Sequence, residues 1–215
     1  MSELERTLAR ELHGFALQLK TTIADDDSLS RAIGELRALR AQWGEAPRPR
    51  WFDGMAPGGP GPEIGLNFND YSLFRGHANP LAAALEPTLV TLPDGRRAVE
   101  ARVTCDQLYE GPPHGVHGGY VAGLFDDVLG GTIRLAAGGP AAVTGTLEVK
   151  YRKITPLDAE LRFVAWVHHT SGRRIHSKAT CHAGEVLTAE ADALFVRVDM
   201  GALADRQAEY RPRGA

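Results

Sequence analysis

Cysteine, long apolar runs and an excess of positive charge are all scarce in this sequence. The 215 residues include only two cysteines, Cys105 and Cys181, which do not form the close-spaced pair that holds zinc or exchanges disulfides. The formal net charge is −3, so the chain lacks the broad positive field that nucleic acid or anionic lipid headgroups require. We therefore expect free, buried thiols and no nucleic-acid partner.

Uninterrupted apolar segments are also missing. Nowhere do ~18 apolar residues follow one another, as a membrane-spanning helix needs. Charges begin at Glu3, which is unlike a signal peptide. Hydrophobic residues make up 43% of the chain and charged residues 24%, as in ordinary globular proteins. These features predict a cytoplasmic protein without a membrane span, most of which folds around a core.

The first 45 residues have the periodicity of two helices. Apolar residues recur at steps of three and four from Leu4 to Ile23 and again from Leu29 to Trp43, which predicts one apolar stripe on each helix. The aspartates at 25–27, between the two runs, can cap the second helix. We expect an N-terminal helical hairpin, residues 1–45. Because short helices are marginal alone, it must dock on the main domain, on a second subunit or on another protein.

The rest of the chain divides by composition. Residues 46–80 begin rich in proline and glycine and continue without a clear period, which predicts a linker and an irregular segment. We expect the main domain at 81–200 and a C-terminal tail at 201–215. Within the domain, alternating patterns predict strands, and one stretch at about 118–135 predicts a helix. About six strands around one helix indicate an α+β fold, an antiparallel sheet with the helix on one face.

The helical stretch carries an unusual row of residues. At 100° per residue, Gly119, Gly123, Asp126 and Gly130 lie nearly opposite the apolar face. Each interior glycine costs roughly 1 kcal/mol relative to alanine, so the row predicts a close approach by a second helix, another backbone or a slender ligand. Asp126 faces this constriction, whereas Asp127 is expected to be a solvated or arginine-paired surface charge.

Two glycines stand where this helix should begin. Gly118 and Gly119 follow a Pro-Pro-His-Gly turn at 112–115, which predicts unpaired N–H groups at a helix start. Such groups form a ready anion or oxyanion site. The other interpretation is an ordinary glycine-rich helix entry.

The segments GPPHGVHGGYVAGLFDD and TGTLEVKYRKITPL resemble the hotdog-fold acyl-CoA thioesterases of the PaaI and thioesterase-superfamily-member group, and the resemblance covers roughly residues 81–199. It implies the hotdog fold, in which a curved antiparallel sheet wraps round one central helix. It also implies a homodimer or a dimer of dimers and an acyl-CoA or acyl-carrier thioester as substrate. Asp126 matches the family's catalytic acid, Gly118 its oxyanion donor and Thr144 its supporting hydroxyl, while His117 matches a histidine that shapes the loop.

One position departs from the family's pattern. Many members have Asn where this chain has Gly111, although a branch with Gly-Pro-Pro lacks it too. His114 is either a substitute for that side chain or a structural histidine of the loop. With Gly119 it completes the candidate substrate-binding residues near the helix start.

The spacing of the acid and the donor indicates how the site is assembled. Gly118 and Asp126 are eight residues apart, about 12 Å along a helix, yet both must come within ~3 Å of one carbonyl group. We therefore expect the donor and the acid to come from different chains across a two-fold interface. Asp126 could act as a general base or as a nucleophile that gives a mixed anhydride.

Other polar residues have weaker patterns. Strict alternation directs Thr144 to the side of Thr146, away from the apolar set, so its catalytic role comes only from the resemblance. Arg173 and Arg174 at a hairpin, with Lys178, could meet the phosphates of coenzyme A or be solvated. His168 and His169 are expected on opposite strand faces, and neither a metal nor another cofactor is expected.

The predicted function is hydrolysis of an acyl-CoA or related thioester to free acid and thiol. The alternatives are a non-catalytic module that binds acyl thioesters and, less strongly, a hotdog dehydratase, whose His-Phe-Pro-Gly motif is absent. Serine hydrolases and nucleotide enzymes have no support, because no Gly-x-Ser-x-Gly elbow or phosphate-binding glycine loop occurs.

Overall fold

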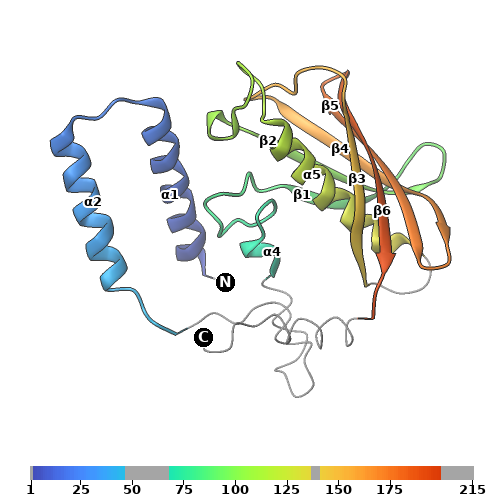
Figure 1. Ribbon diagram of the computed structural model, residues 1–215, viewed down its shortest axis with the longest axis horizontal. Coiled ribbons are helices and arrows are strands. Elements are labelled where there is room, and N and C mark those ends of the chain that lie inside the picture. The colour runs from blue at the N-terminus through green and yellow to red at the C-terminus, as the bar shows by residue number, and fades with distance from the viewer. Residues whose placement is uncertain (1, 47–67, 137–140, 200–215) are drawn as a thin grey trace. The chain divides into compact units, whose positions relative to one another are not determined.

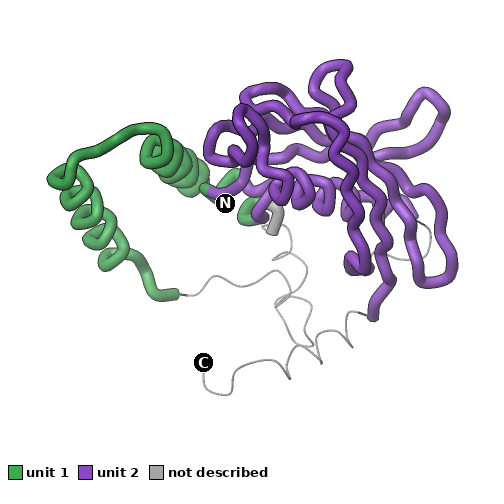
Figure 2. The backbone as a smooth tube through the Cα atoms, turned by 45° about the horizontal axis from the view of Figure 1, so that its top comes forward, with its two compact units in different colours: residues 1–71, 77–80 green, residues 72–76, 81–215 purple. Residues whose placement is uncertain are grey.

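The computed structural model describes residues 2–46, 68–136 and 141–199 (Figure 1). Two compact units can be distinguished, residues 1–71 with 77–80 and residues 72–76 with 81–215 (Figure 2). Nearly all of the predicted proline- and glycine-rich stretch and the whole predicted tail, 201–215, lie outside the described residues.

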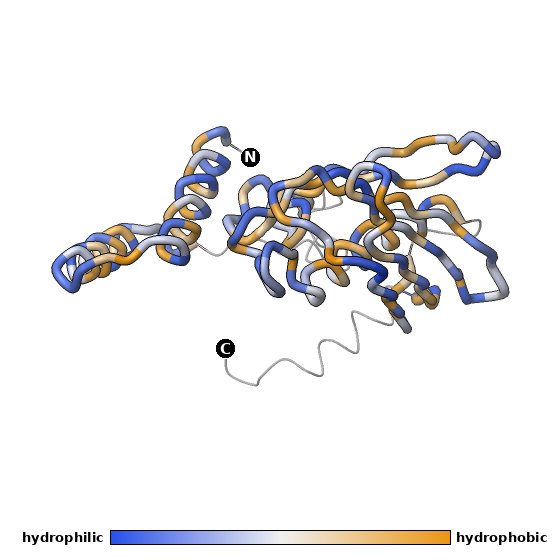
Figure 3. Tube along the Cα trace, turned by 90° about the horizontal axis from the view of Figure 1, so that it is seen from above, coloured by the Kyte–Doolittle hydropathy of each residue, from blue (hydrophilic) through white to orange (hydrophobic). Residues whose placement is uncertain are grey.

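The first unit contains the predicted pair of N-terminal helices. Helix α1 spans Glu3–Thr21 and helix α2 spans Asp26–Ala41, and a short helix, α4, covers Phe68–Tyr71. Ser2 begins α1 with a capping box, and the Asp25 side chain accepts the Ser28 N–H at the start of α2, as the aspartates predicted. Polar and apolar residues alternate along both helices (Figure 3).

The second unit is a six-stranded antiparallel sheet with a helix on one face. Helix α5 spans Gly118–Gly131 and continues as a 3-10 turn to Leu135. The sheet order is β1-β2-β4-β5-β6-β3 (Figure 1). The strands are β1 Glu86–Thr91, β2 Arg97–Thr104, β3 Ala142–Tyr151, β4 Glu160–Ser171, β5 Arg174–Ala183 and β6 Val186–Arg197. The predicted α+β fold, with about six strands and one helix, is confirmed.

The core lies between α5 and the sheet. Phe125 on α5 meets Phe163 on β4 edge to face, with ring centroids 5.0 Å apart, and both side chains are fully buried. The residues predicted to face the sheet are all buried: Val121, Leu124, Phe125 and Val128 on α5, and Thr132 in the 3-10 turn that follows it. Their burial sets the rotation of the helix, and Asp126 therefore lies off the sheet-facing side.

Both cysteines are buried free thiols, as expected. Burial raises the pKa of the Cys105 thiol to about 12 and that of Cys181 to about 11. Because the thiolate is the reactive form, neither cysteine is a nucleophile at neutral pH.

Residues 72–76 and 81–85, here called the strap, pack beside α5. The Phe74 ring covers Gly123 so closely that a Cβ there would lie 2.2 Å from it. Leu85 N–H donates to the Phe74 carbonyl at 2.8 Å, and Ala83 N–H donates to the Tyr120 hydroxyl at 3.0 Å.

The glycine row is explained only in part by a close approach. At Gly123 the approaching group is the Phe74 ring rather than a helix, a backbone or a ligand. At Gly130 a Cβ would meet nothing within 4 Å among the described residues of this chain, so a close approach at that position stays a prediction.

Asp127 is arginine-paired but is not a surface charge. Arg75 of the strap places Nε 2.7 Å from Asp127 Oδ1, and the Asp127 side chain is only 10% exposed. Burial raises the pKa of Asp127 above its ordinary value, and the Arg75 charge opposes that rise. The expectation of a solvated site was wrong because the strap, which has no clear sequence period, covers this side of the helix.

Removing the strap's arginine should destabilise the domain. We expect Arg75→Met to cost about 3 kcal/mol, since it leaves a buried carboxylate without its cation. The pKa of Asp127 should rise further, so the folded state binds more protons than the unfolded one and stability falls as pH rises above about 4. Urea unfolding at pH 5 and pH 8 measures both effects. Asp94→Asn, in an exposed pair with Arg96, is the control, and an equal loss in the two variants would contradict the prediction.

Candidate functional site

A β-bulge in β3 decides where Thr144 points. Thr144 pairs with Phe195 on β6, and Thr146 pairs with Leu194. A step of two residues on β3 therefore matches a step of only one residue on β6. The extra residue, Gly145, shifts the alternation of side chains by one. Thr144 therefore lies opposite the buried Phe195, on the helix-facing side. Its side chain stays exposed, but the expectation that it shares a side with Thr146 was wrong.

This position lets Thr144 hold Asp126. The Thr144 hydroxyl donates to Asp126 Oδ1 at 2.8 Å, and Asp126 is only partly buried on the row of α5 that faces away from the core. A hydrogen bond from a hydroxyl fixes the carboxylate's orientation and leaves its other oxygen available. The structure thus brings together two residues eighteen positions apart that the resemblance had paired.

The start of α5 leaves one backbone donor available. Among the first four N–H groups of the helix, Gly119 donates to His117 Nδ1 at 3.0 Å, and Tyr120 and Val121 donate to the His117 carbonyl. The fourth belongs to Gly118, and no acceptor for it occurs among the described residues. Gly118 therefore offers the free N–H expected of an anion site. Gly119 does not, because His117 caps it.

Tyr151 is a site residue that the sequence reasoning missed. It ends β3 opposite the buried Ala189, and its hydroxyl donates to the Gly118 carbonyl at 2.7 Å. It holds the first residue of α5 against the edge of the sheet. Thr144 and Tyr151 are an odd number of residues apart, and the bulge is what allows both to face the helix.

Comparisons with known proteins agree with this geometry. The family model described as "Thioesterase superfamily" matches residues 114–190. The crystal structure of protein RHA08564, a thioesterase superfamily protein, is similar with a TM-score of 0.67 and 26% identity, over 91% of this chain and 95% of that one. Residues 114–190 thus match the thioesterase superfamily, and the domain that contains them has the hotdog fold.

A curated relative is similar to this chain over a shorter stretch. Acyl-coenzyme A thioesterase THEM4 of Xenopus laevis is 31% identical over 106 residues, which is 46% of each protein. The chain thus spans about half the length of that relative. No helix in the described part of the chain is both long and apolar enough to cross a bilayer.

The packing of the loop before α5 explains why this chain has Gly111 where many family members have asparagine. A Cβ at Gly111 would lie 2.6 Å from His117 Cα, so any side chain there collides with the backbone that starts the helix. His114 has φ +59°, and its N–H donates to Glu110 Oε1 at 3.0 Å. Its carbonyl accepts the Leu157 N–H. These backbone contacts favour the structural interpretation of His114.

The arginines proposed for coenzyme A lie at the end of the sheet that carries Thr144. Arg174 pairs with Val196 across β5 and β6. The Arg173 guanidinium donates to the Arg197 carbonyl at 3.1 and 2.8 Å. A phosphate role for these side chains stays a prediction.

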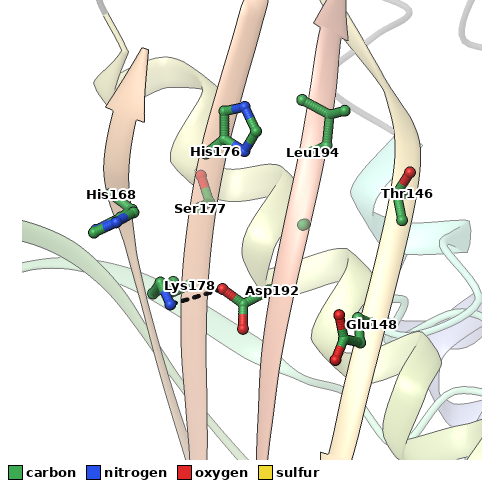
Figure 4. Close-up of a pocket in the computed structure, with 9 residues that line it drawn as sticks. Thr146, Glu148, His168, His176, Ser177, Lys178, Asp192 and Leu194 are labelled. Atoms are coloured by element: carbon green, nitrogen blue, oxygen red, sulfur yellow. Dashed lines mark ion pairs between the residues drawn. The ribbon is translucent and has the colours of Figure 1, made fainter.

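Lys178 lies in a different place, a hollow of about 260 Å³ on the sheet's outer face (Figure 4). Its ammonium pairs with Asp192 at 2.9 Å, so it is already neutralised. His168 and His176 line the same hollow.

A second bulge gathers three histidines. The β4–β5 register shifts between Val167 and His169, and the His168 and His169 rings lie 5.2 Å apart. The His169 ring also stacks on His176 at 4.2 Å. The expectation that His168 and His169 point to opposite faces was wrong for the same reason as at Thr144. Across the described ranges, no group of three or more His, Cys, Asp or Glu side chains could hold a metal ion.

Two further cavities flank the start of α5. The smaller, about 310 Å³, is lined by Gly118, Tyr151, Arg152 and Lys153 with apolar neighbours. The larger, about 670 Å³, reaches His117 and Gly119 and is otherwise mainly apolar. A ligand held at the Gly118 N–H would therefore lie at the smaller cavity, and the larger cavity reaches the two residues on either side of Gly118 in the sequence.

Proposed function

We propose that this protein hydrolyses an acyl-CoA or related acyl thioester to free acid and thiol, and that each active site combines Asp126 of one chain with the Gly118 N–H of a second. The observation that carries the proposal is that residues near the two ends of β3 hydrogen-bond to the two groups that the reaction needs. Thr144 holds the carboxylate at one end and Tyr151 holds the oxyanion donor at the other.

The chemistry follows from these two groups. As general base, Asp126 takes a proton from water as the oxygen attacks the thioester carbonyl, and the Gly118 N–H stabilises the oxyanion. Collapse of the tetrahedral intermediate expels the thiolate, which takes up a proton. As nucleophile, Asp126 instead forms a mixed anhydride and releases the thiol, and water then hydrolyses the anhydride. Both routes use the same donor.

The two groups are too far apart within one chain. Gly118 and Asp126 lie on one continuous helix and are separated by about 12 Å along it. One carbonyl group has to contact both, within ~3 Å. A single copy of α5 does not meet this requirement.

A second copy can bring them together through β3. This strand ends the sheet order, so one of its edges has no strand partner in the described part of the chain, and Val143 and Tyr151 on it are 42% and 52% exposed. Exposed strand edges readily pair with another chain. If two copies pair antiparallel near the middle of β3, the strands lie about 4.8 Å apart, and the end of β3 that carries Thr144 lies beside the end of the partner subunit's β3 that corresponds to Tyr151.

This pairing would place each Asp126 beside the partner subunit's Gly118, and the two-fold symmetry would create two equal sites. A homodimer is therefore the functional unit of the proposal, with a dimer of dimers as the next level of assembly. The proposed location is the cytoplasm, and the proposed subgroup is the PaaI-like one.

Thiol release from a panel of acyl-CoA substrates tests the activity, and Gly118→Pro tests the donor. Proline removes the N–H but is well tolerated at the first position of a helix, and His117 has φ −56° and ψ 129°, as a residue before proline prefers. We expect kcat to fall about 10²- to 10³-fold. Gly118→Ala is the matched control, since it brings a Cβ to the same place, 3.3 Å from the Tyr151 hydroxyl, but keeps the N–H.

The result separates the proposal from its alternative. Equal activity of the Pro and Ala variants would exclude Gly118 as the donor. Tight binding of acyl-CoA without thiol release from any substrate would indicate a non-catalytic binding module instead.

A further inference from the structure

We propose that the 670 Å³ cavity beside the start of α5 binds the acyl chain of the substrate, and that the strap makes the enzyme selective for medium to long apolar chains. This inference rests on the proposed function, because it assigns one half of the thioester to a place next to the Gly118 N–H.

The cavity's walls suit a hydrocarbon. Leu73, Phe74 and Leu81 of the strap form one side, and Leu108 and Tyr109 form another. Leu73 is 50% and Leu81 58% exposed. An apolar chain that covers these leucines removes their surface from water, which is favourable by roughly 25 cal/mol per Å².

The tyrosines in the wall present ring surface rather than reactive groups. The Tyr109 and Tyr120 rings stack with centroids 4.3 Å apart. The Tyr109 hydroxyl donates to the Leu81 carbonyl at 3.3 Å, and the Tyr120 hydroxyl accepts the Ala83 N–H. Burial raises the pKa of Tyr120 to about 12 and also raises that of Tyr109. Both hydroxyls therefore stay protonated at neutral pH and serve to anchor the strap.

The only carboxylate among the described residues that line the cavity, Glu110, is already hydrogen-bonded within the loop. Glu110 lines the cavity, but its Oε1 accepts the His114 N–H at 3.0 Å. The walls are otherwise apolar or aromatic apart from His117, whose Nδ1 accepts the Gly119 N–H. A charged or strongly polar acyl group would find few partners here.

The smaller cavity, which Gly118 itself lines, suits the thiol half better. It holds about 310 Å³ and has the cations Arg152 and Lys153 in its lining, which favours the phosphate-bearing carrier. A carbonyl held at the Gly118 N–H would direct its acyl group to one side and its sulfur to the other. Size and charge together assign the acyl group to the larger, apolar cavity.

The part of the chain that would set selectivity is not the part that matches the family. The family model covers residues 114–190, whereas the strap and the turn at Gln107–Tyr109 precede it. The ion pair between Arg75 and Asp127 and the packing of Phe74 on Gly123 fix the strap to the catalytic helix. Acyl selectivity can therefore change through the strap while the catalytic groups stay in place.

The test measures kcat/KM on straight-chain acyl-CoA substrates of four to fourteen carbons for the wild type, Leu81→Trp and Leu73→Trp. Each methylene that enters the cavity should raise kcat/KM about fourfold until the cavity is filled. Tryptophan fills part of the cavity, so both variants should lose at least tenfold on the longest substrates and less than twofold on the shortest. Leu89→Trp is the control, because Leu89 is similarly exposed, at 57%, but lies on β1 outside the cavity.

The outcomes distinguish the two proposals. Activity with no dependence on chain length, or an equal effect of the tryptophans on every substrate, would overturn the assignment of the cavity and leave the hydrolase proposal standing. No thiol release from any substrate would overturn the hydrolase proposal itself. In that case titration of the wild type with non-hydrolysable alkyl-CoA thioethers decides on the cavity, since affinity that does not rise with chain length would overturn it too.

Discussion

Asp126→Asn should lower kcat/KM for thioester hydrolysis by about 10²- to 10⁴-fold, the usual contribution of a positioned base. Asparagine has the shape of aspartate and its amide oxygen can still accept the Thr144 hydroxyl, but it can neither take a proton from water nor attack the carbonyl. Both proposed routes therefore fail at the same atom. Steady-state thiol release with each accepted substrate measures the loss.

The variant should fold normally. Asp126 is partly exposed and lies outside the buried face of α5, so its charge is not part of the core. Its thermal unfolding should therefore match that of the wild type. Asp192→Asn is the matched control, since this carboxylate belongs to an exposed ion pair on the sheet's outer face and should leave activity unchanged. Wild-type kcat in the Asp126→Asn protein would end the case for this carboxylate.

Periodicity predicted the elements of the domain but not the residues at its irregular points. The buried stripe of α5, including Leu124 and Val128, followed directly from the helical repeat. The side of β3 on which Thr144 lies did not, because one extra residue reverses an alternating pattern and leaves no mark in composition. A glycine within a strand, here Gly145, is the signal that could have indicated the bulge.

The strap could not be predicted for a different reason. The sequence of residues 66–82 shows no helical or strand period, and the position of the strap depends on contacts with residues far away in the sequence. Arg75 meets Asp127 and Phe74 meets Gly123, and neither pair is visible in a local pattern. The same holds for Tyr151, whose tie to Gly118 joins two elements 33 residues apart. Part of the candidate site therefore depends on tertiary contacts, which a local sequence pattern does not reveal.

Mixing two inactive variants should restore activity if the site is shared between chains. In a mixed dimer of Asp126→Asn and Gly118→Pro chains, one site would combine the intact Asp126 of the proline chain with the intact Gly118 of the asparagine chain. The second site would hold both defects. Random pairing makes half of the dimers mixed, and one site in two works in each, so about a quarter of the wild-type activity should return.

The activity of the mixed dimer is best measured after it has been separated from the two kinds of homodimer. The two chains are co-expressed with different affinity tags, and the mixed dimer is isolated by two successive affinity steps and assayed for thiol release; purified in this way, it should reach about half of the wild-type kcat per dimer. The control replaces the proline chain with one that carries both substitutions, which leaves no intact site in any pairing. If the acid and the donor instead came from one chain, the mixed dimer would show only the sum of the two residual activities. That result would contradict the shared site, because an eight-residue separation along α5 would then have been closed within a single subunit.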